Sequence, residues 1–112
     1  MPSFVSLNLN KDFLRLYHRG KSCAKPALVV YAMKNRCGVC RAGITTSKKI
    51  GHAVARNRAR RVIRAALQDT LRAHDLSGWD FVFVARTKTT RVKEPAVCAA
   101  MEAALRALGV IA

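Results

Sequence analysis

The clearest pattern of apolar positions lies in the middle of the chain and is helical. Apolar residues recur there at helical spacing over more than three turns: Ala59, Val62, Ile63, Ala66, Leu67 and Leu71. This spacing places them along one stripe of an α-helix that packs on a core. The opposite arc is polar and contains Asn57, Arg60, Arg61, Arg64 and Gln68, with Arg58 at its margin. The pattern therefore predicts a long helix with one apolar and one cationic face.

Two further helices are predicted nearer the ends of the chain. Residues 10–18 form a short amphipathic segment, with Asn10 as the expected cap and Gly20 as the expected stop. A last helix is expected to begin near Glu94–Pro95, because proline suits the first helical turn. Its apolar stripe consists of Val97, Met101, Ala104, Leu105 and Leu108.

Three apolar segments predict strands. Cys23–Met33 is expected to be one strand, with Pro26 at its start or at a sheet edge, because proline cannot donate to a central ladder. A turn at Asn35–Gly38 then leads to a second strand, Arg41–Thr46, expected to be antiparallel to the first. Phe81–Ala85 is a continuous apolar run, which is typical of a strand that is covered on both faces.

The order of these elements defines the fold class. A helix, two or three strands, a helix, a strand and a last helix follow one another. This αβββαβα-like order predicts an α+β protein with a single mixed sheet of about four strands backed by helices. The 112 residues contain no internal repeat, low-complexity segment or linker, so we expect a single domain over residues 1–112.

The distribution of charged residues along the chain indicates which kind of molecule it binds. The chain has 21 Lys and Arg against 6 Asp and Glu, a formal net charge of +15. Residues 13–68 contain no carboxylate and hold 14 of the 21 cations, so the remaining sequence is nearly balanced, with 7 cations and 6 carboxylates. Cations concentrated in one stretch indicate a basic face that binds nucleic acid, with an anionic membrane as the main competitor. No apolar run approaches the roughly 20 residues of a membrane span, and no export signal is recognisable. We therefore expect a cytoplasmic protein with no membrane partner.

The cysteines give only a weak signal. Cys37 and Cys40 form a C-x-x-C pair, but a zinc site needs two more ligands and no second pair follows. We expect reduced thiols without a role and no protein-bound metal, and a zinc or redox protein is the most distant alternative.

A basic loop followed by the arginine-rich helix is the most specific motif. Residues 47–64 read S-K-K-I-G-H-A-V-A-R-N-R-A-R-R-V-I-R. This order of a Ser-Lys-Lys-x-Gly loop, an Arg-Asn-Arg triplet and further arginines resembles the signature of the bacterial ribonuclease P protein family. The likeness covers nearly the whole chain, because the predicted first helix and the strand segments 28–31 and 81–86 also fall where that family has them.

The resemblance implies a function. It implies a protein subunit of ribonuclease P, which binds the catalytic RNA subunit and the 5′ leader of precursor tRNA. It further implies that this subunit assists Mg²⁺-dependent endonucleolytic removal of the leader, with Mg²⁺ bound mainly to the RNA. The positions matching the family's RNA-binding motif are Ser47, Lys48, Lys49, Arg56, Asn57, Arg58, Arg60, Arg61 and Arg64.

The chemistry of these side chains agrees with RNA binding. A guanidinium grips phosphate through two parallel hydrogen bonds and also stacks on bases. A merely solubilising helix face would contain glutamates spaced to pair with the arginines, and none occurs between Lys48 and Gln68. Arg56 projects toward the apolar side, and we place it in the first turn, where its side chain reaches solvent.

Two aromatic residues of the first helix allow two interpretations. Phe13 and Tyr17 are spaced i and i+4, and spacing alone favours a place in the core. The resemblance implies instead that they line a cleft for the single-stranded 5′ leader, since aromatic faces suit unpaired bases.

The carboxylates do not suggest protein-based catalysis. Metal-assisted phosphodiester hydrolysis needs several converging carboxylates, whereas the six in this chain are dispersed and lie outside the basic stretch. We expect no catalytic residue in the protein and no nuclease activity without the RNA. The main alternative is a structural RNA-binding or ribosome-associated protein without a processing role, and the combination of motif and aromatics favours the processing subunit.

Overall fold

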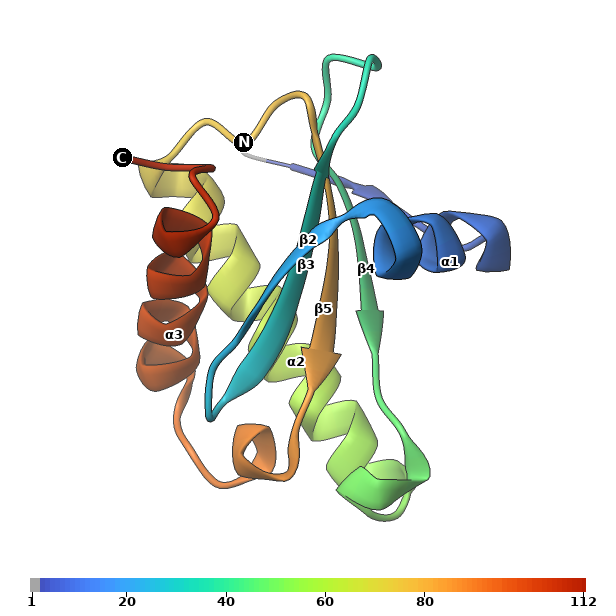
Figure 1. Ribbon diagram of the computed structural model, residues 1–112. Coiled ribbons are helices and arrows are strands. Elements are labelled where there is room, and N and C mark those ends of the chain that lie inside the picture. Colours follow the sequence, from blue (N-terminus) through green and yellow to red (C-terminus); the bar gives the residue numbers. More distant parts are fainter. Residues whose placement is uncertain (1–2) are drawn as a thin grey trace.

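A mixed five-stranded sheet forms the centre of the structure (Figure 1). The computed structural model describes residues 3–112. In the spatial order β1-β4-β5-β3-β2, the strands are β1 (Val5–Ser6), β4 (Arg41–Thr45), β5 (Trp79–Ala85), β3 (Leu28–Lys34) and β2 (Lys21–Ala24). β4 is parallel to both β1 and β5, whereas β3 is antiparallel to both β5 and β2. The sheet is mixed, as predicted, but it has five strands rather than about four.

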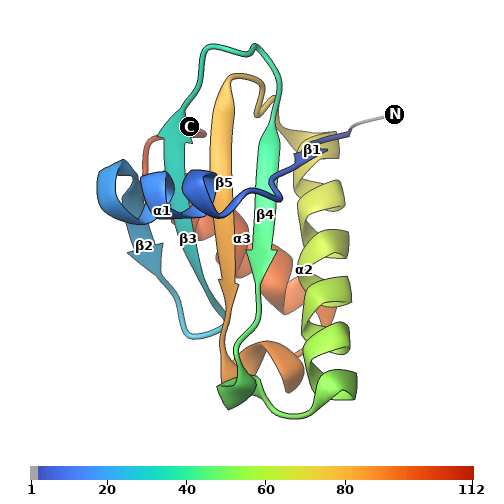
Figure 2. The ribbon, with the colours of Figure 1, turned by 90° about the vertical axis from the view of Figure 1, so that its right-hand side faces the viewer.

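Three helices cover the two faces of this sheet. α2 (Ala53–Ala73) and α3 (Glu94–Ala107) lie on one face, and α1 (Asn10–Arg19) crosses the other (Figures 1 and 2). Single 3₁₀ turns precede α2 and α3, namely η1 (Lys48–Ile50) and η2 (Thr87–Thr90). From α1 onward the order is αβββαβα, so the predicted α+β class is confirmed. No helix within residues 3–112 is long and apolar enough to cross a membrane.

The central strand β5 is buried on both faces, as its apolar run predicts. Phe81 and Phe83 are fully buried and belong to the core beneath α2 and α3. Val82 points to the other face, where it packs with Leu7 and Leu16 beneath α1. The predicted stripes of α2 and α3 fill the first of these cores, with Ala59, Ile63, Ala66, Leu67, Val97, Met101, Ala104 and Leu105 all buried.

The predicted strand Cys23–Met33 is a hairpin instead. Pro26 lies in the turn between β2 and β3, where the backbone N–H of Lys25 donates to the carbonyl of Leu28 over 2.8 Å. Because proline has no N–H, it interrupts the ladder at this point. The chain reverses here, and the residues before Pro26 add an edge strand to the sheet.

The predicted antiparallel direction of Arg41–Thr46 relative to β3 is confirmed, but the two strands are not neighbours in the sheet. β4 runs in the opposite direction to β3, but β5 lies between them and pairs with both. A strand that is apolar on both faces is most stable at the centre of a sheet, because both of its faces are then covered.

Of the two residues expected to bound α1, Asn10 and Gly20, only Gly20 has the predicted role. Leu9 is the N-cap and no side-chain cap bond forms, so Asn10 is the first helical residue and not the cap. Gly20 does end the helix. A Cβ at this position would lie 2.6 Å from the carbonyl oxygen of Leu16, so a larger residue would collide with the last turn.

Candidate nucleic-acid interface

The polar arc of α2 is an exposed cationic surface. Its exposed members, here called the α2 basic face, are Asn57, Arg58, Arg60, Arg61 and Arg64, whereas Gln68 is half-buried. All members of the α2 basic face except Arg58 line a groove of about 480 Å³ together with Val54, which is 80% exposed. None of the described residues that line this groove is a carboxylate, so an anion entering it meets cationic, amide and apolar groups.

Two side chains of the α2 basic face are held by neighbouring segments. The Nε–H of Arg58 donates to the carbonyl of Thr90 over 3.4 Å, and Nη2 of Arg60 donates to Oγ1 of Thr46 over 3.0 Å. The two other arginines of this face form no side-chain hydrogen bond within residues 3–112. Their guanidinium groups keep all their donors for an external acceptor.

The loop before α2 places more cations at the start of the helix. Ile50 is buried and fixes η1 against the core. Gly51 has φ 133°, a conformation that side chains rarely adopt, and a Cβ there would lie 3.2 Å from that of Ala55. Gly51 is therefore required by the turn itself. Arg56 is half-buried in the first turn, as predicted. The exposed predicted residues of the loop are Ser47, Lys48 and Lys49.

The tertiary structure adds a group of cations that sequence reasoning missed. Exposed cations of η2 and its flanks are Arg86, Lys88, Arg91 and Lys93. The hydroxyl of buried Thr89 holds this turn by donating to the carbonyl of Ala27 and accepting from the N–H of Arg86. η2 contacts both α2 and η1, so its cations extend the same surface. The sequence did contain a signal for this group, since residues 86–93 include four cations and no carboxylate. We call Lys48, Lys49, the α2 basic face and the η2 cations the main basic surface.

The two aromatic residues of α1 differ in their environments. Phe13 is half-buried and packs on the sheet, because Gly43 has no side chain; a Cβ there would lie 2.5 Å from Cζ of Phe13. Tyr17 is 39% exposed and meets Tyr31 edge to face, with ring centroids 4.9 Å apart. Tyr31 was missed by sequence reasoning, although period-two alternation places it on the α1 side of β3.

The aromatic pair borders a part of the sheet that no helix covers. Figure 2 shows α1 lying across the strands, while their portions nearer η1 and η2 have no helix on this face. Val29, Tyr31 and Val84 are half-buried there. An extended chain crossing from Tyr17 toward η1 would pass over apolar and aromatic side chains and then reach the main basic surface.

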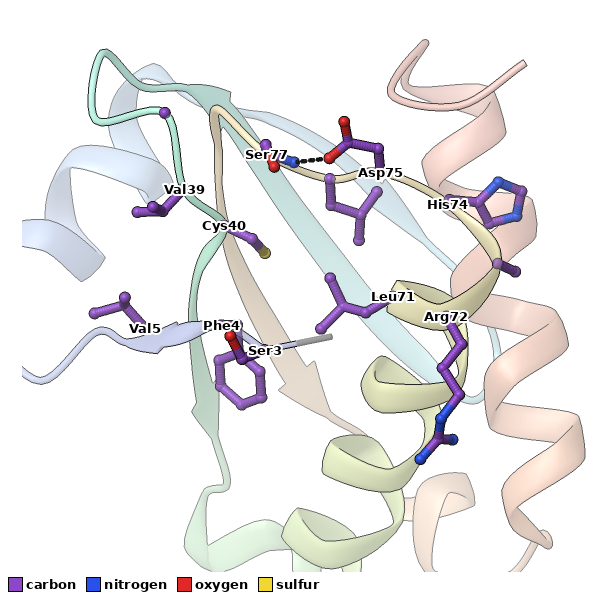
Figure 3. A pocket seen from close by; sticks show the side chains of 13 residues that line it. Ser3, Phe4, Val5, Val39, Cys40, Leu71, Arg72, His74, Asp75 and Ser77 are labelled. Atoms are coloured by element: carbon purple, nitrogen blue, oxygen red, sulfur yellow. Dashed lines mark hydrogen bonds between the residues drawn. The ribbon is translucent and has the colours of Figure 1, made fainter. Parts of the chain in front are cut away.

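A separate cavity lies at the other end of the sheet. It has a volume of about 520 Å³ and lies between the segment 3–5, the loop before β4 and the end of α2 (Figure 3). Cys40 lines it, and burial together with the charge of Asp80 raises the pKa of this thiol to about 12. The thiol is therefore protonated at neutral pH and is a poor nucleophile.

Metal-binding groups are sparse. Within residues 3–112, no group of three or more His, Cys, Asp or Glu residues is placed to hold a metal ion. Cys37 is exposed, whereas Cys40 is buried, so the two thiols of the C-x-x-C pair occupy different environments. That these cysteines have no role stays a prediction.

The fold and this surface together define a class: a small α+β protein built to bind nucleic acid. The family model "Ribonuclease P" matches residues 1–109. The chain belongs to this family of bacterial ribonuclease P proteins, as the sequence motif predicts. RNA binding and a place in tRNA processing follow from that membership.

Individual relatives and solved structures agree with this family assignment. The chain is 42% identical over 80 residues to the ribonuclease P protein component of Clostridium botulinum (strain Langeland), covering 71% of this chain and 72% of the relative. It is 45% identical over 87 residues to that of Pelotomaculum thermopropionicum, covering 78% and 77%. The solved RNase P protein of Staphylococcus aureus has a TM-score of 0.83 at 29% identity, covering 98% of this chain and 100% of the other. That of Thermotoga maritima has a TM-score of 0.77 at 30% identity, covering 96% and 97%.

Proposed function

We propose that this chain binds the catalytic RNA subunit of ribonuclease P and the 5′ leader of precursor tRNA, and thereby assists Mg²⁺-dependent endonucleolytic removal of the leader. The product is the mature 5′ end of the tRNA. One observation supports this proposal above all: the main basic surface lies beside an uncovered, partly aromatic sheet face. The first binds phosphates, and the second suits unpaired bases.

The main basic surface acts by neutralising phosphate charge. Each guanidinium that pairs with a phosphate forms short, charge-assisted hydrogen bonds and releases condensed counterions. Two RNA molecules that meet at this protein would otherwise repel each other. The arginines with free donors contribute most, because binding breaks no internal hydrogen bond.

The leader lies across the uncovered sheet face in this proposal. Tyr17 offers one exposed ring, and the edge-to-face contact with Tyr31 limits its rotation. A preorganised ring loses little freedom when a base stacks on it. Phe13 contributes mainly by packing on Gly43, which sets the position of α1 and therefore of Tyr17.

Magnesium is assigned mainly to the RNA subunit. The described residues offer no cluster of metal ligands, and both oxygens of buried Asp80 already accept hydrogen bonds from Arg41. The donor set within residues 3–112 does not fit a catalytic metal site. The protein's own contribution is to bind, orient and neutralise.

Reconstitution tests this function. Protein added to ribonuclease P RNA should lower the Mg²⁺ concentration needed for half-maximal cleavage of precursor tRNA, because it replaces part of the charge screening that the metal supplies. The protein without RNA should cleave nothing at any Mg²⁺ concentration. An unchanged Mg²⁺ requirement would favour a structural or ribosome-associated role, and cleavage by RNA-free protein would place catalytic groups in the chain.

A further inference from the structure

A buried carboxylate at the start of β5 holds two arginines from distant parts of the chain. Asp80 is 1% exposed. Its Oδ1 accepts hydrogen bonds from Nε of Arg41 over 2.8 Å and Nδ2 of Asn35 over 2.7 Å. Its Oδ2 accepts from Nη2 of Arg41 over 2.6 Å and Nη2 of Arg15 over 2.8 Å. Two of these hydrogen bonds hold the guanidinium of Arg41 and one holds that of Arg15, while the fourth, from Asn35, fixes the carboxylate itself.

The two arginines remain accessible from outside. The side chain of Arg15 is 35% exposed and that of Arg41 is 23% exposed. Neither guanidinium spends all of its donors on Asp80, so both can still donate to an external acceptor.

These arginines border an open cavity with more cations. The cavity has a volume of about 770 Å³, and its charged and histidine side chains are those of Lys11, Asp12, Arg15, His18, Arg19 and Arg41. Asp12 lies 3.5 Å from Arg15, and Asp80 lies beneath. Four cations therefore face two carboxylates, which leaves an excess of two positive charges. Lys11 and Arg19 are exposed and form no side-chain hydrogen bond or ion pair within residues 3–112.

This cavity is separate from the proposed leader path. Arg15 contacts Asp80 at the start of β5, whereas Tyr17 contacts Tyr31, whose partner on β5 is Val82. Positions 15 and 17 lie about 200° apart around a helix, so they project from opposite flanks of α1. The main basic surface begins beyond the other end of the strands, at η1 and η2 (Figure 2).

We propose that the α1 basic patch, consisting of Lys11, Arg15, His18, Arg19 and Arg41, binds a backbone phosphate of RNA as a second contact surface. This inference rests on the proposed function. Asp80 is the positioning residue, because it fixes the planar forks of Arg15 and Arg41 at the cavity. A fixed guanidinium loses less freedom on binding phosphate than a free surface arginine does. The phosphate belongs either to the RNA subunit or to the precursor tRNA.

The first test removes two cations that hold nothing else in place. In the variant Lys11→Gln/Arg19→Gln, binding should weaken about tenfold near physiological salt, with the log-log salt slope reduced by about 0.7 to 0.9 per lost contact. The matched control is Arg72→Gln/Arg106→Gln, which removes the same charge from α2 and α3 on the other face of the sheet. The control should bind like the parent.

Two binding arms identify the source of the phosphate. One measures protein binding to ribonuclease P RNA alone, and the other measures precursor tRNA binding to the assembled holoenzyme. A loss in the first arm assigns the phosphate to the RNA subunit, and a loss only in the second assigns it to the precursor. Parent-like binding in both arms overturns the proposal.

A second variant separates an organised site from a general charge effect. Asp80→Asn removes one negative charge and so raises the net charge by one, and a site that depended on net charge alone would then bind RNA more tightly. A site that needs two fixed guanidinium groups should bind more weakly. Circular dichroism establishes first that this variant folds; if it does not, the double variant decides the question.

The outcome is distinguishable from failure of the proposed function. If Arg61→Ala on α2 reduces cleavage by the holoenzyme while Lys11→Gln/Arg19→Gln behaves like its control, the processing role stands and the second surface is wrong. If the protein has no effect on cleavage at all, the proposed function itself fails.

Discussion

Individual residues decide how α1 presents its aromatic side chains. Phe13 lies close to the sheet only because residue 43 is glycine, and Tyr17 is left exposed beside Tyr31. The sequence offered two interpretations of this i, i+4 pair, core or leader cleft. The structure separates the two positions, since one is packed on the sheet and the other is accessible to a base.

Replacement of Tyr17 should give a defect that depends on leader length. Tyr17→Ala removes a stacking surface worth roughly 1 to 3 kcal/mol per base, so precursor tRNA with a leader of several nucleotides should bind the holoenzyme more weakly. A precursor with a one-nucleotide leader should be nearly unaffected. Tyr17→Phe is the matched control and should retain most of the affinity. Equal losses for long and short leaders would remove Tyr17 from the leader site.

A side chain at position 43 should disturb Phe13 directly. In Gly43→Ala, the new Cβ would lie 2.5 Å from the ring of Phe13, and relieving this overlap should cost about 1 to 3 kcal/mol of unfolding free energy. Phe13→Leu in the same chain should recover part of that loss, because it shortens the group that collides. Urea unfolding of the two single variants and the double variant measures this coupling. Additive effects would show that Phe13 does not depend on Gly43.

At the scale of elements, α2 has two functions. Its apolar stripe fills the core with Ile63 and Leu67, and its opposite face presents arginines to solvent. The apolar side chains and the arginines do not compete for the same positions, because helical geometry places them on opposite sides of the helix axis. The side chain of Arg58 also connects α2 to η2 through the carbonyl of Thr90, so this helix positions the neighbouring cations as well.

Arginine variants on α2 should weaken RNA binding for every substrate. Arg58→Ala and Arg61→Ala each remove a phosphate contact, so the log-log salt slope should fall by about one contact in each case. The loss should not depend on leader length, in contrast to Tyr17→Ala. Arg72→Ala is the matched control, because Arg72 is in the last turn of the same helix and pairs with Asp69. A slope that is unchanged in both test variants would exclude these arginines from the interface.

At the scale of the whole molecule, charge is divided between the two ends of the sheet. The main basic surface lies at η1, η2 and the start of α2, and the α1 basic patch lies beside the start of β5. The chain has a net charge of +15, and only 6 carboxylates oppose its 21 cations. Long-range attraction to RNA should therefore be strong and sensitive to salt.

Affinity for ribonuclease P RNA should fall steeply with ionic strength. Six or more phosphate contacts correspond to a loss of about a thousandfold between 50 and 200 mM salt. Filter binding or fluorescence anisotropy across this range measures the slope. A loss smaller than about tenfold would mean that apolar or base contacts dominate the interface instead.

The sequence by itself determined the helices, the buried strand Phe81–Ala85 and the cationic face of α2. These features depend on residues a few positions apart, and helical or strand geometry converts such spacing directly into a face. The motif at residues 47–64 was sufficient to identify the family, because the order of its residue types is specific and needs no tertiary structure to be recognised.

Only the tertiary structure decided the strand order, the addition of the η2 cations to the main basic surface and the pairing of Tyr17 with Tyr31. It also decided that Arg15 and Asp80, 65 residues apart, share one buried hydrogen-bonded cluster. The physical reason is that each of these contacts depends on which segments pack together in the core. Local periodicity specifies which face of an element is apolar, but not which distant element covers it.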